Sequence, residues 1–435
     1  MTKDEIILAN QEFLFPAVFH YYKEPLVIAR AKDQFVYDAE GNQYLDFFGG
    51  ILTISVGHCN DRVNAAVHQQ IDRLEHVSTL FPTEPQAALA KRLAEIAPGN
   101  VRQSFFTNSG TEANETAILA ARCYTGSAEI IALRHSYHGR SALAMSLTGT
   151  SNWRLAGAMQ PGIVHTANAY CYRCPFGLTY PSCNVQCARD LEDVIRSSTY
   201  GRVAGIIAEP IQGVGGFITP PREYFQIVAD IVRRHGGIFI SDEVQTAWGR
   251  TGGKWWGIEQ YGVQPDVITS AKGLGNGLPI GLTMATLEVA AGLRGATIST
   301  FGGNPVTTTA AKAVIDLIDE QNLMANAAET GAYLREKLDE LREKHPLIGE
   351  VRGMGLMQAL ELVRSPTTKE PAVEETARLM EAARENRLLI GKGGMFGNVI
   401  RISPPLNIRQ ADVDAFARAL DASLVQCAAG DVSAR

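Results

Sequence analysis

The chain has 435 residues and a mass of 47.1 kDa, enough for two or three domains or for one large domain with a smaller satellite. With 46% hydrophobic and 20% charged residues it is ordinary for a globular protein, which excludes a disordered chain, a fibre and a small disulfide-rich scaffold. The 40 basic and 46 acidic side chains give a net charge of −6 without a basic run, so no nucleic-acid partner is expected. No apolar stretch approaches the roughly 20 residues of a membrane span, and the N-terminal segment lacks the order of a signal peptide. We therefore expect a cytoplasmic protein without a membrane partner.

Residues 25–48 alternate apolar and polar side chains around turn residues, which predicts short strands. From about residue 100 to 285, short apolar runs at 129–133, 203–210, 237–243 and 266–272 alternate with segments of helical period. Runs of this kind are typical of strands buried on both faces of a parallel sheet. The alternation of strand and helix predicts an α/β fold built from crossover units.

The pattern of apolar and polar residues changes after about residue 305. Helical patterns at 307–320, 326–343, 373–387 and 411–426 surround strand-like pieces at 349–362 and 398–403. We interpret this part as a smaller α+β domain that the N-terminal strands join. The predicted division is an N-terminal segment (1–48), a large domain (49–305) and a C-terminal small domain (306–435).

The first candidate site lies at the start of a predicted helix, at Ser109. Ser109 and Glu112 have the spacing of a capping box. The helix N-terminus offers free N–H groups and the positive end of the helix dipole, and Gly110 lets a ligand approach closely. With the Ser109 and Thr111 hydroxyls as added donors, this is a candidate phosphate site. The alternative is an ordinary capped helix.

Asp242 and Lys272 each follow an apolar run, at the carboxyl end of a predicted strand, where open α/β sheets bind ligands. A carboxylate at Asp242 can keep a pyridinium nitrogen protonated, or it can cap the following turn. A partly desolvated Lys272 has a lowered pKa and can form a Schiff base, or it can be a solvated turn lysine. Because Lys272 precedes its glycines, the segment is not a nucleotide-binding loop of the form G-x-x-x-x-G-K-[ST].

These three features together describe pyridoxal 5′-phosphate (PLP), which carries an aldehyde, a ring nitrogen and a phosphate. The segments S-D-E-V-Q-T-A-W-G-R-T-G (241–252) and A-K-G-L-G-N-G-L-P (271–279) closely resemble the signature of class III aminotransferases. The resemblance continues, in the family's order, through N-S-G-T-E-A-N (108–114), S-Y-H-G-R (136–140), A-E-P-I-Q-G (208–213), T-F-G-G-N-P (300–305), V-R-G-M-G-L (351–356) and R-I-S-P-P-L (401–406). It implies PLP fold type I, a large domain with a mostly parallel central sheet plus the smaller α+β domain.

The resemblance also implies roles for individual residues. Lys272 would form the Schiff base and move the proton, and Asp242 would hold the ring nitrogen. The phosphate group would contact Ser109, Gly110 and Thr111, with Thr300 completing the phosphate site of the partner subunit. Tyr137 would stack on the ring face, His138 would line the same edge, Gln245 would lie near the phenolic oxygen, and Glu209 would lie close to the cofactor. Arg401 would clamp the substrate carboxylate, with Arg140 as a second anion contact. No metal is implied. The expected assembly is a homodimer with shared active sites, or a tetramer of two such dimers.

One position departs from part of the family. Members that act on 4-aminobutyrate or ornithine carry Glu where this chain has Val214, and that Glu pairs with the carboxylate-binding arginine and gates it. Its absence argues against those two substrates. The chain is most similar to the alanine–glyoxylate and β-alanine aminotransferase branch and to its phospholyase and ammonia-lyase relatives. The expected substrates are therefore a small amino acid or ω-amino acid and a 2-oxo acid such as pyruvate or glyoxylate.

Four of the seven cysteines fall in one short window: Cys171, Cys174, Cys183 and Cys187. The C-x2-C and C-x3-C spacings resemble a small metal knuckle, but reduced, partly buried thiols are favoured over a metal, and redox-sensitive disulfides are the third alternative. Nothing in the class III mechanism requires a metal there. The window lies in a segment that we expect to influence substrate specificity.

Three other functions remain to be weighed against a transaminase. A PLP lyase on the same scaffold would release ammonia or phosphate from a small amino-phosphonate or amino-phosphate compound. A Rossmann-type oxidoreductase is disfavoured because no G-x-G-x-x-G follows an N-terminal strand. A non-catalytic binding protein is disfavoured by the complete set of site residues.

Overall fold

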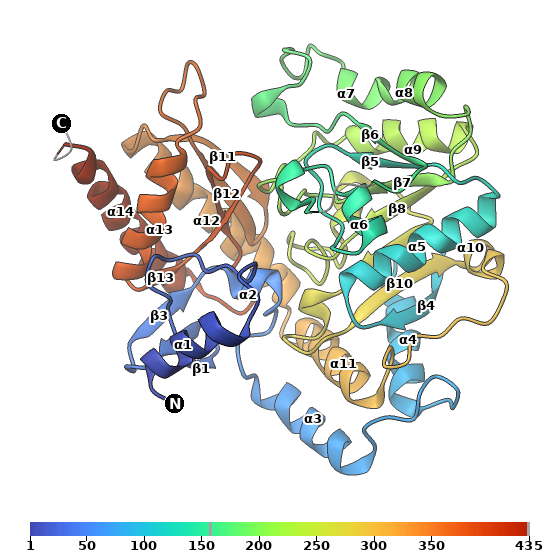
Figure 1. The fold of residues 1–435 in the computed structure, drawn as a ribbon, viewed down its shortest axis with the longest axis horizontal. Helices are drawn as coiled ribbons and strands as arrows, with labels where there is room; N and C mark the ends of the chain where they lie inside the picture. The colour runs from blue at the N-terminus through green and yellow to red at the C-terminus, as the bar shows by residue number, and fades with distance from the viewer. Residues whose placement is uncertain (156–158, 433–435) are drawn as a thin grey trace.

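The computed structural model describes residues 1–155 and 159–432. It has two lobes, with the central part of the chain in one and both ends of the chain in the other (Figure 1). Within the described ranges, no helix is both long enough and apolar enough to cross a membrane.

The larger lobe is built on a seven-stranded sheet with the order β4-β10-β9-β8-β7-β5-β6. Strand β10 is antiparallel to both of its neighbours, and the pairs from β9 to β6 are parallel. The mostly parallel sheet is confirmed, as are the strands expected from the four apolar runs. The strands are β4 (Val101–Thr107), β5 (Ile130–Leu133), β6 (Ile163–Thr166), β7 (Gly205–Ala208), β8 (Ile238–Asp242), β9 (Val267–Ser270) and β10 (Gly281–Thr286).

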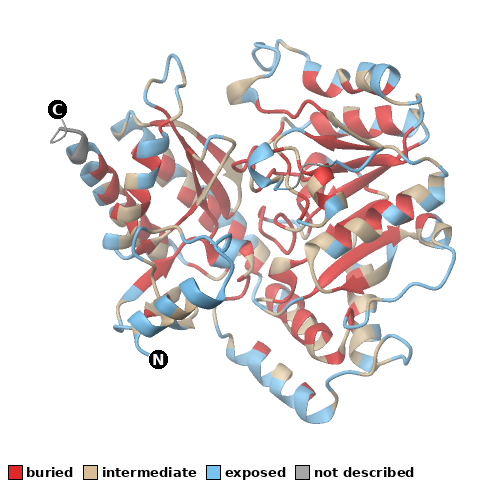
Figure 2. Ribbon diagram, viewed as in Figure 1, coloured by how far each residue is buried: buried red, intermediate tan, exposed pale blue. Residues whose placement is uncertain are grey.

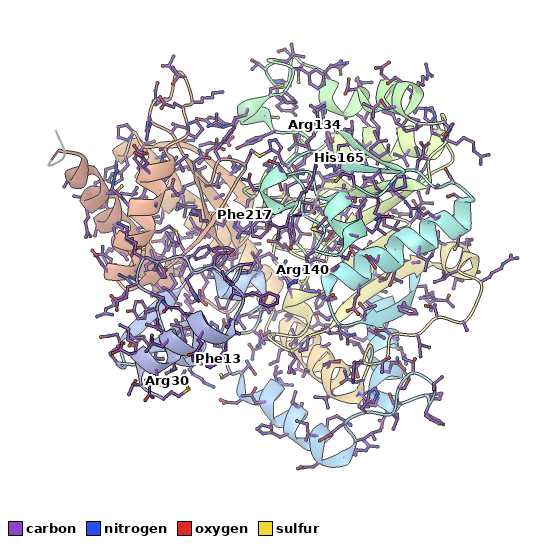
Figure 3. All side chains as sticks on the ribbon, in the orientation of Figure 1. Phe13, Arg30, Arg134, Arg140, His165 and Phe217 are labelled. Carbon is purple, nitrogen blue, oxygen red and sulfur yellow. The ribbon has the colours of Figure 1, made fainter. Side chains whose placement is uncertain are left out.

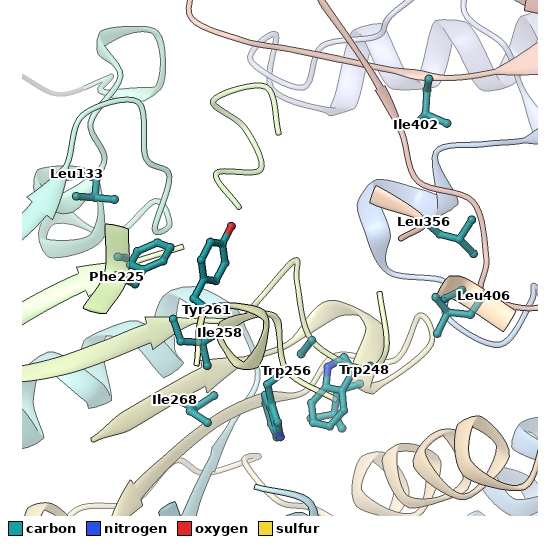
Figure 4. Packing of buried hydrophobic residues seen from close by; sticks show 14 of the residues in the cluster. Leu133, Phe225, Trp248, Trp256, Ile258, Tyr261, Ile268, Leu356, Ile402 and Leu406 are labelled. Carbon is teal, nitrogen blue, oxygen red and sulfur yellow. The ribbon is translucent and has the colours of Figure 1, made fainter. Parts of the chain in front are cut away.

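Both faces of this sheet are covered, which explains why its strands are continuously apolar (Figure 2). Ile131, Ile206 and Phe239 point into one hydrophobic cluster, while their neighbours Ile130 and Ile207 point into the other. The second cluster includes the buried side of α5, and the first includes α9 and the large side chains of Figure 4. The helices and short helical turns of this lobe are α5 (Gly110–Thr125), α6 (Ala142–Leu147), α7 (Gln186–Arg189), α8 (Leu191–Ser198), α9 (Tyr224–Arg234) and α10 (Leu287–Gly292).

The second lobe contains two smaller sheets. One is antiparallel in the order β11-β12-β15-β14, and the other has the order β1-β2-β3-β13. The short strand β13 pairs in parallel with β3, so a C-terminal segment completes the sheet of the N-terminal strands. The strands are β1 (Ile28–Lys32), β2 (Phe35–Asp38), β3 (Gln43–Asp46), β11 (Ile348–Met354), β12 (Met357–Leu362), β13 (Leu388–Leu389), β14 (Gly391–Gly393) and β15 (Val399–Ile402).

The remaining helices pack on this lobe or connect it to the large sheet. The four C-terminal helices expected from periodicity are present, each within a few residues of its expected bounds. They are α11 (Pro305–Glu320), α12 (Leu323–Lys344), α13 (Val373–Glu385) and α14 (Gln410–Val432); the N-terminal ones are α1 (Lys3–Phe13), α2 (Gly49–Leu52), α3 (Asp61–Arg73) and α4 (Glu84–Ile96). The domain boundaries at 48/49 and 305/306 stay a prediction. Residues 433–435, at the end of the predicted C-terminal domain (306–435), lie outside the described residues.

Candidate active site

A cavity of about 130 Å³ lies at the carboxyl ends of β7, β8 and β9. This is the edge at which parallel α/β sheets bind ligands, because the crossover connections leave it open. Among the residues that line it are Gly110, Thr111, Tyr137, His138, Glu209, Asp242, Gln245 and Lys272, all named from the sequence. Ser109, Thr300, Arg140 and Arg401 do not line this cavity.

Lys272 follows β9 with a backbone φ of 42°, a left-handed conformation that is uncommon for a residue with a side chain. It borders the cavity, and burial lowers the pKa of its amine to about 8. The carboxylates of Asp242 and Glu209 oppose this change, while Arg401 reinforces it. A substantial fraction of the amine is therefore neutral near physiological pH, which is the form that attacks a carbonyl carbon.

Asp242 ends β8 and is held by a buried polar network. Its Oδ2 accepts a hydrogen bond from Asn114 Nδ2 at 2.8 Å and lies 2.7 Å from His138 Nδ1. Its Oδ1 accepts from the backbone N–H of Val244 at 3.1 Å. The Thr269 hydroxyl in turn donates to Asn114 Oδ1 at 2.6 Å. These contacts fix the direction of the Asp242 carboxylate.

Sequence reasoning assigned no role to Asn114 or Thr269, although both serve this network. Asn114 lies one helical turn after Gly110 in α5, on the side of the helix that borders the cavity. Thr269 is in β9, opposite Asp242 in the strand pairing. The i, i+4 spacing from the predicted phosphate-binding glycine was the signal that could have identified Asn114.

Glu209 follows β7 and is buried beside Lys272. Its carboxylate accepts hydrogen bonds from the backbone N–H groups of Tyr137, at 2.9 Å, and Gly213, at 2.8 Å. Burial raises its pKa to about 7, against the opposing influence of His138 and of the two backbone donors. Gln245 packs so closely on Gly213 that a Cβ there would lie 2.2 Å from Gln245 Nε2.

The first turn of α5 is shaped to receive an anion. Ser109 is its N-cap: the Ser109 hydroxyl accepts from Glu112 N at 3.2 Å and donates to Glu112 Oε2 at 3.1 Å. Thr111 borders the cavity, and a Cβ on Gly139 would lie 2.4 Å from the Thr111 hydroxyl oxygen. Glycine is therefore required at 139 for the backbone to approach the helix end. The free N–H groups of this turn point to a phosphate.

Two buried polar atoms at the cavity have no hydrogen-bond partner among the described residues, His138 Nε2 and Gln245 Oε1. Unpaired buried polar groups are rare, so these atoms mark positions for ligand atoms. The cavity also offers a ligand a partly neutral lysine, an oriented carboxylate and a helix N-terminus. This donor set fits PLP, whose aldehyde, ring nitrogen and phosphate require those three partners.

Arg401 lies in β15, in the second lobe, and is 4% exposed. Its Nε donates to the carbonyl of Lys392 at 3.2 Å, and its Nη1 has no partner among the described residues. Its guanidinium carbon lies 5.1 Å from the ring centre of Phe48 and 5.7 Å from that of Phe217. Burial lowers its pKa, and a hydrogen bond with Tyr21 opposes that change. The positive charge of Arg401 also contributes to lowering the pKa of Lys272.

Arg140 and Thr300 lie outside the cavity that contains Lys272. The Arg140 side chain is exposed, although its charge influences the Tyr137 phenol; Figure 3 shows it in the middle of the view, between the lobes. Thr300 is exposed and follows Ser299, whose hydroxyl accepts from Asn108 Nδ2 at 3.2 Å. This segment therefore lies beside the start of α5 but outside the cavity of its own chain.

The cysteine window forms a cluster away from this cavity. Cys171, Cys174, Cys183 and Cys187 line one cavity of about 20 Å³. All four are free thiols, and no group of three or more His, Cys, Asp or Glu side chains in the described part of the chain is arranged to hold a metal ion. Burial, with the neighbouring thiols adding to it, raises the pKa of Cys171 to about 11 and that of Cys187 to about 12. These two thiols are therefore protonated at neutral pH.

Comparison with known proteins agrees with this geometry. The family model described as aminotransferase class III matches residues 19–424. A protein of Arabidopsis thaliana named alanine–glyoxylate aminotransferase 2 homolog 2, mitochondrial, is 44% identical over 97% of this chain and 88% of its own length. A leucine/methionine racemase of Thermococcus litoralis is 38% identical over 95% of this chain and 94% of its own. The solved structure of an amine transaminase from an uncultivated Pseudomonas species, in a PLP-bound form, has a TM-score of 0.89 at 32% identity and covers 96% of this chain and 99% of that one.

Proposed function

The chain belongs to the class III aminotransferase family of PLP-dependent enzymes, and we propose that it moves an amino group from a small amino acid or ω-amino acid to a 2-oxo acid such as pyruvate or glyoxylate. The observation that carries this choice of substrates is Arg401, a buried cation whose Nη1 has no hydrogen-bond partner among the described residues. A planar guanidinium binds a carboxylate with two parallel hydrogen bonds. The glyoxylate in the name of the Arabidopsis relative supports the same class of acceptor.

In this proposal each residue acts at a defined atom. Bound PLP supplies an electron sink that allows a substrate C–H bond to ionise. The neutral Lys272 amine takes that proton and returns it, for which a pKa of about 8 is well matched. The Asp242 carboxylate, fixed by Asn114, keeps a proton on the ring nitrogen. The first turn of α5 (Ser109, Gly110, Thr111) holds the phosphate, and the remaining contacts of the cofactor are Tyr137, His138, Glu209 and Gln245.

The surroundings of Val214 support continuous access to Arg401. The carbonyl of Val214 accepts a hydrogen bond from Gly394 N at 2.9 Å, and its side chain carries no charge. Among the side chains that the structure describes, no carboxylate pairs with the Arg401 guanidinium, whose Nε donates to the Lys392 carbonyl. Arg401 is thus available to a substrate carboxylate in both half-reactions, and Arg140 at the outer edge of the site is a second, weaker contact for it.

The substitution Arg401→Ala tests this assignment. We expect KM for pyruvate or glyoxylate to rise by about 100-fold, because a charge-assisted pair inside the protein is worth a few kcal/mol. The half-reaction with an amine that carries no carboxylate, such as isopropylamine, should change by less than about threefold, since it makes no such pair. Arg401→Lys, which keeps the charge without the planar pair of donors, should fall between the two. Steady-state kinetics and single-turnover rates measure both effects, and an equal loss on both substrates would remove Arg401 from the anion site.

The proposal includes a cytoplasmic homodimer in which Thr300 completes the phosphate site of the other subunit; a tetramer would be two such dimers. Support comes from the surface beside α5, where the exposed side chains of Ile298 and Phe301 are apolar. The exposed Leu80 and Phe81 follow shortly after His76, whose ring lies 5.3 Å from that of Phe301. Such a concentration of apolar surface is typical of a protein interface. No disulfide bond joins the cysteines that the structure describes, which is compatible with a reducing compartment.

A further inference from the structure

The turn formed by residues 213–217 contacts both ends of the proposed substrate site. At its start, Gly213 N donates to the Glu209 carboxylate at 2.8 Å. In its middle, the Val214 carbonyl accepts from Gly394 N, next to the strand whose Lys392 carbonyl holds Arg401. At its end, the Phe217 ring lies under the Arg401 guanidinium. The position of this turn therefore determines the surroundings of Arg401.

The backbone of the turn requires external support. Gly216 has φ of 104° and Phe217 has φ of 52°, and a residue with a bulky side chain rarely adopts a positive φ. Such conformations persist only where neighbouring groups hold them. The Gly216 carbonyl, between the two, accepts a hydrogen bond from Arg352 Nε at 2.8 Å.

Arg352 is itself firmly anchored in the second lobe. It lies in β11, is 7% exposed, and donates from Nη1 to Glu361 at 2.6 Å and to Glu350 at 2.5 Å. Its guanidinium carbon lies 5.1 Å from the ring centre of Tyr170, whose hydroxyl donates to Glu361. Hydrogen bonds between ionised groups are the stronger ones, and the planar fork of arginine fixes the direction of the Nε–H bond.

We propose that Arg352 is a positioning residue for the anion-binding end of the active site. From the β11 side it holds the Gly216 carbonyl, and through it the turn that places Phe217 against Arg401 and pairs Val214 with Gly394. Arg352 touches neither substrate nor cofactor in this account. The inference rests on the proposed function, because it assigns the consequence of losing Arg352 to carboxylate binding at Arg401.

The test compares Arg352→Lys with Arg335→Lys in the holoenzyme. Lysine at 352 keeps a positive charge beside Glu361 but cannot reproduce the directed Nε–H bond to Gly216. Arg335 is a matched control, because it bonds to the Val351 and Gly353 carbonyls of the same strand and makes no contact with the turn. The readouts are KM for pyruvate, the inhibition constant of propionate (an unreactive carboxylate), the single-turnover rate with isopropylamine, and the melting temperature.

We expect Arg352→Lys to raise KM for pyruvate and the inhibition constant of propionate by about tenfold, with the isopropylamine rate changed by less than about twofold. Arg335→Lys should lower the melting temperature without changing KM for pyruvate or the inhibition constant of propionate. If Arg352→Lys does not fold, Glu350→Gln, which weakens one anchor of Arg352 at a half-buried site, should shift both constants by about threefold in the same direction.

Equal shifts in Arg352→Lys and Arg335→Lys, or no shift in the folded variants at 352 and 350, would overturn the inference. Arg401→Lys, measured in parallel, separates this failure from failure of the proposed function. If Arg401→Lys loses carboxylate affinity while Arg352→Lys keeps it, the anion site stands and the positioning role is wrong. If Arg401→Lys also keeps full carboxylate affinity, both are wrong.

Discussion

Replacing Lys272 with alanine is expected to lower kcat by roughly four orders of magnitude or more, because the variant loses both the nucleophile and the proton carrier. Lys272 is the only lysine that lines the cavity among the described residues, and burial brings its pKa to about 8. No neighbouring amine can take over the role. Steady-state kinetics with an amino donor and pyruvate measure the loss, and the visible absorbance of the lysine-bound cofactor should disappear with it.

The control for this experiment is Lys254→Ala, an exposed lysine outside the cavity, which should leave kcat unchanged. The cofactor content of Lys272→Ala must also be measured after gel filtration. We expect PLP to remain bound without its covalent link, since Asp242 and the first turn of α5 still hold it. Normal turnover by a PLP-loaded Lys272→Ala variant would contradict the assignment of the active site.

The second large effect is expected for Asp242→Asn. Asparagine has nearly the same shape, but its single acceptor oxygen can keep only one of the two hydrogen bonds that the carboxylate accepts, from Asn114 Nδ2 or from Val244 N, and the negative charge is lost. Without that charge the ring nitrogen is no longer held in its protonated state, and we expect kcat to fall by about 100- to 1,000-fold. Kinetics on the PLP-saturated variant, with its bound cofactor quantified, measure this effect.

Asp266→Asn is a matched control for Asp242→Asn. Asp266 precedes β9, at the opposite edge of the sheet, and its carboxylate accepts from Phe239 N at 2.8 Å and from Arg233 at 3.3 Å. Its replacement should reduce stability with little effect on kcat per folded molecule. If Asp242→Asn kept more than half of the wild-type kcat, the role of Asp242 at the ring nitrogen would be wrong.

Much of the fold was predictable because its signals are local. Strands β5, β7, β8 and β9 are short apolar runs, and their alternation with helices determines a parallel sheet with both faces covered. Asp242 and Lys272 end or follow such runs, so the sequence placed both at one edge of the sheet. The antiparallel direction of β10 and the pairing of β13 with β3 depend on contacts between segments that are distant in the chain. Neither feature has a local signal in the sequence.

The finer structure of the site could not be predicted, because it depends on side-chain directions. The Ser109 hydroxyl is engaged in the cap of α5, and the Arg140 side chain is exposed. The spacing from Gly110 places Asn114 on the cavity side of α5, but its hydrogen bonds with Asp242 and Thr269 depend on the packing of α5 against β8 and β9. Arg352 lies in the segment V-R-G-M-G-L (351–356), yet its contact with Gly216 joins residues that are distant in the chain.

A single-turnover absorbance experiment shows whether this chain transfers amino groups. The PLP-loaded enzyme is mixed, without any oxo acid, with alanine, β-alanine, 4-aminobutyrate, phosphoethanolamine or a hydroxylated aminoethylphosphonate, while ammonia, phosphate and the optical activity of the amino acid are followed. We predict that a small amino acid or ω-amino acid removes the absorbance of the lysine-bound cofactor once, and that pyruvate or glyoxylate restores it. Continuous release of ammonia or phosphate with the absorbance unchanged would identify a lyase. Loss of optical activity without amino transfer would identify a racemase. Either result would contradict amino transfer as the reaction of this chain.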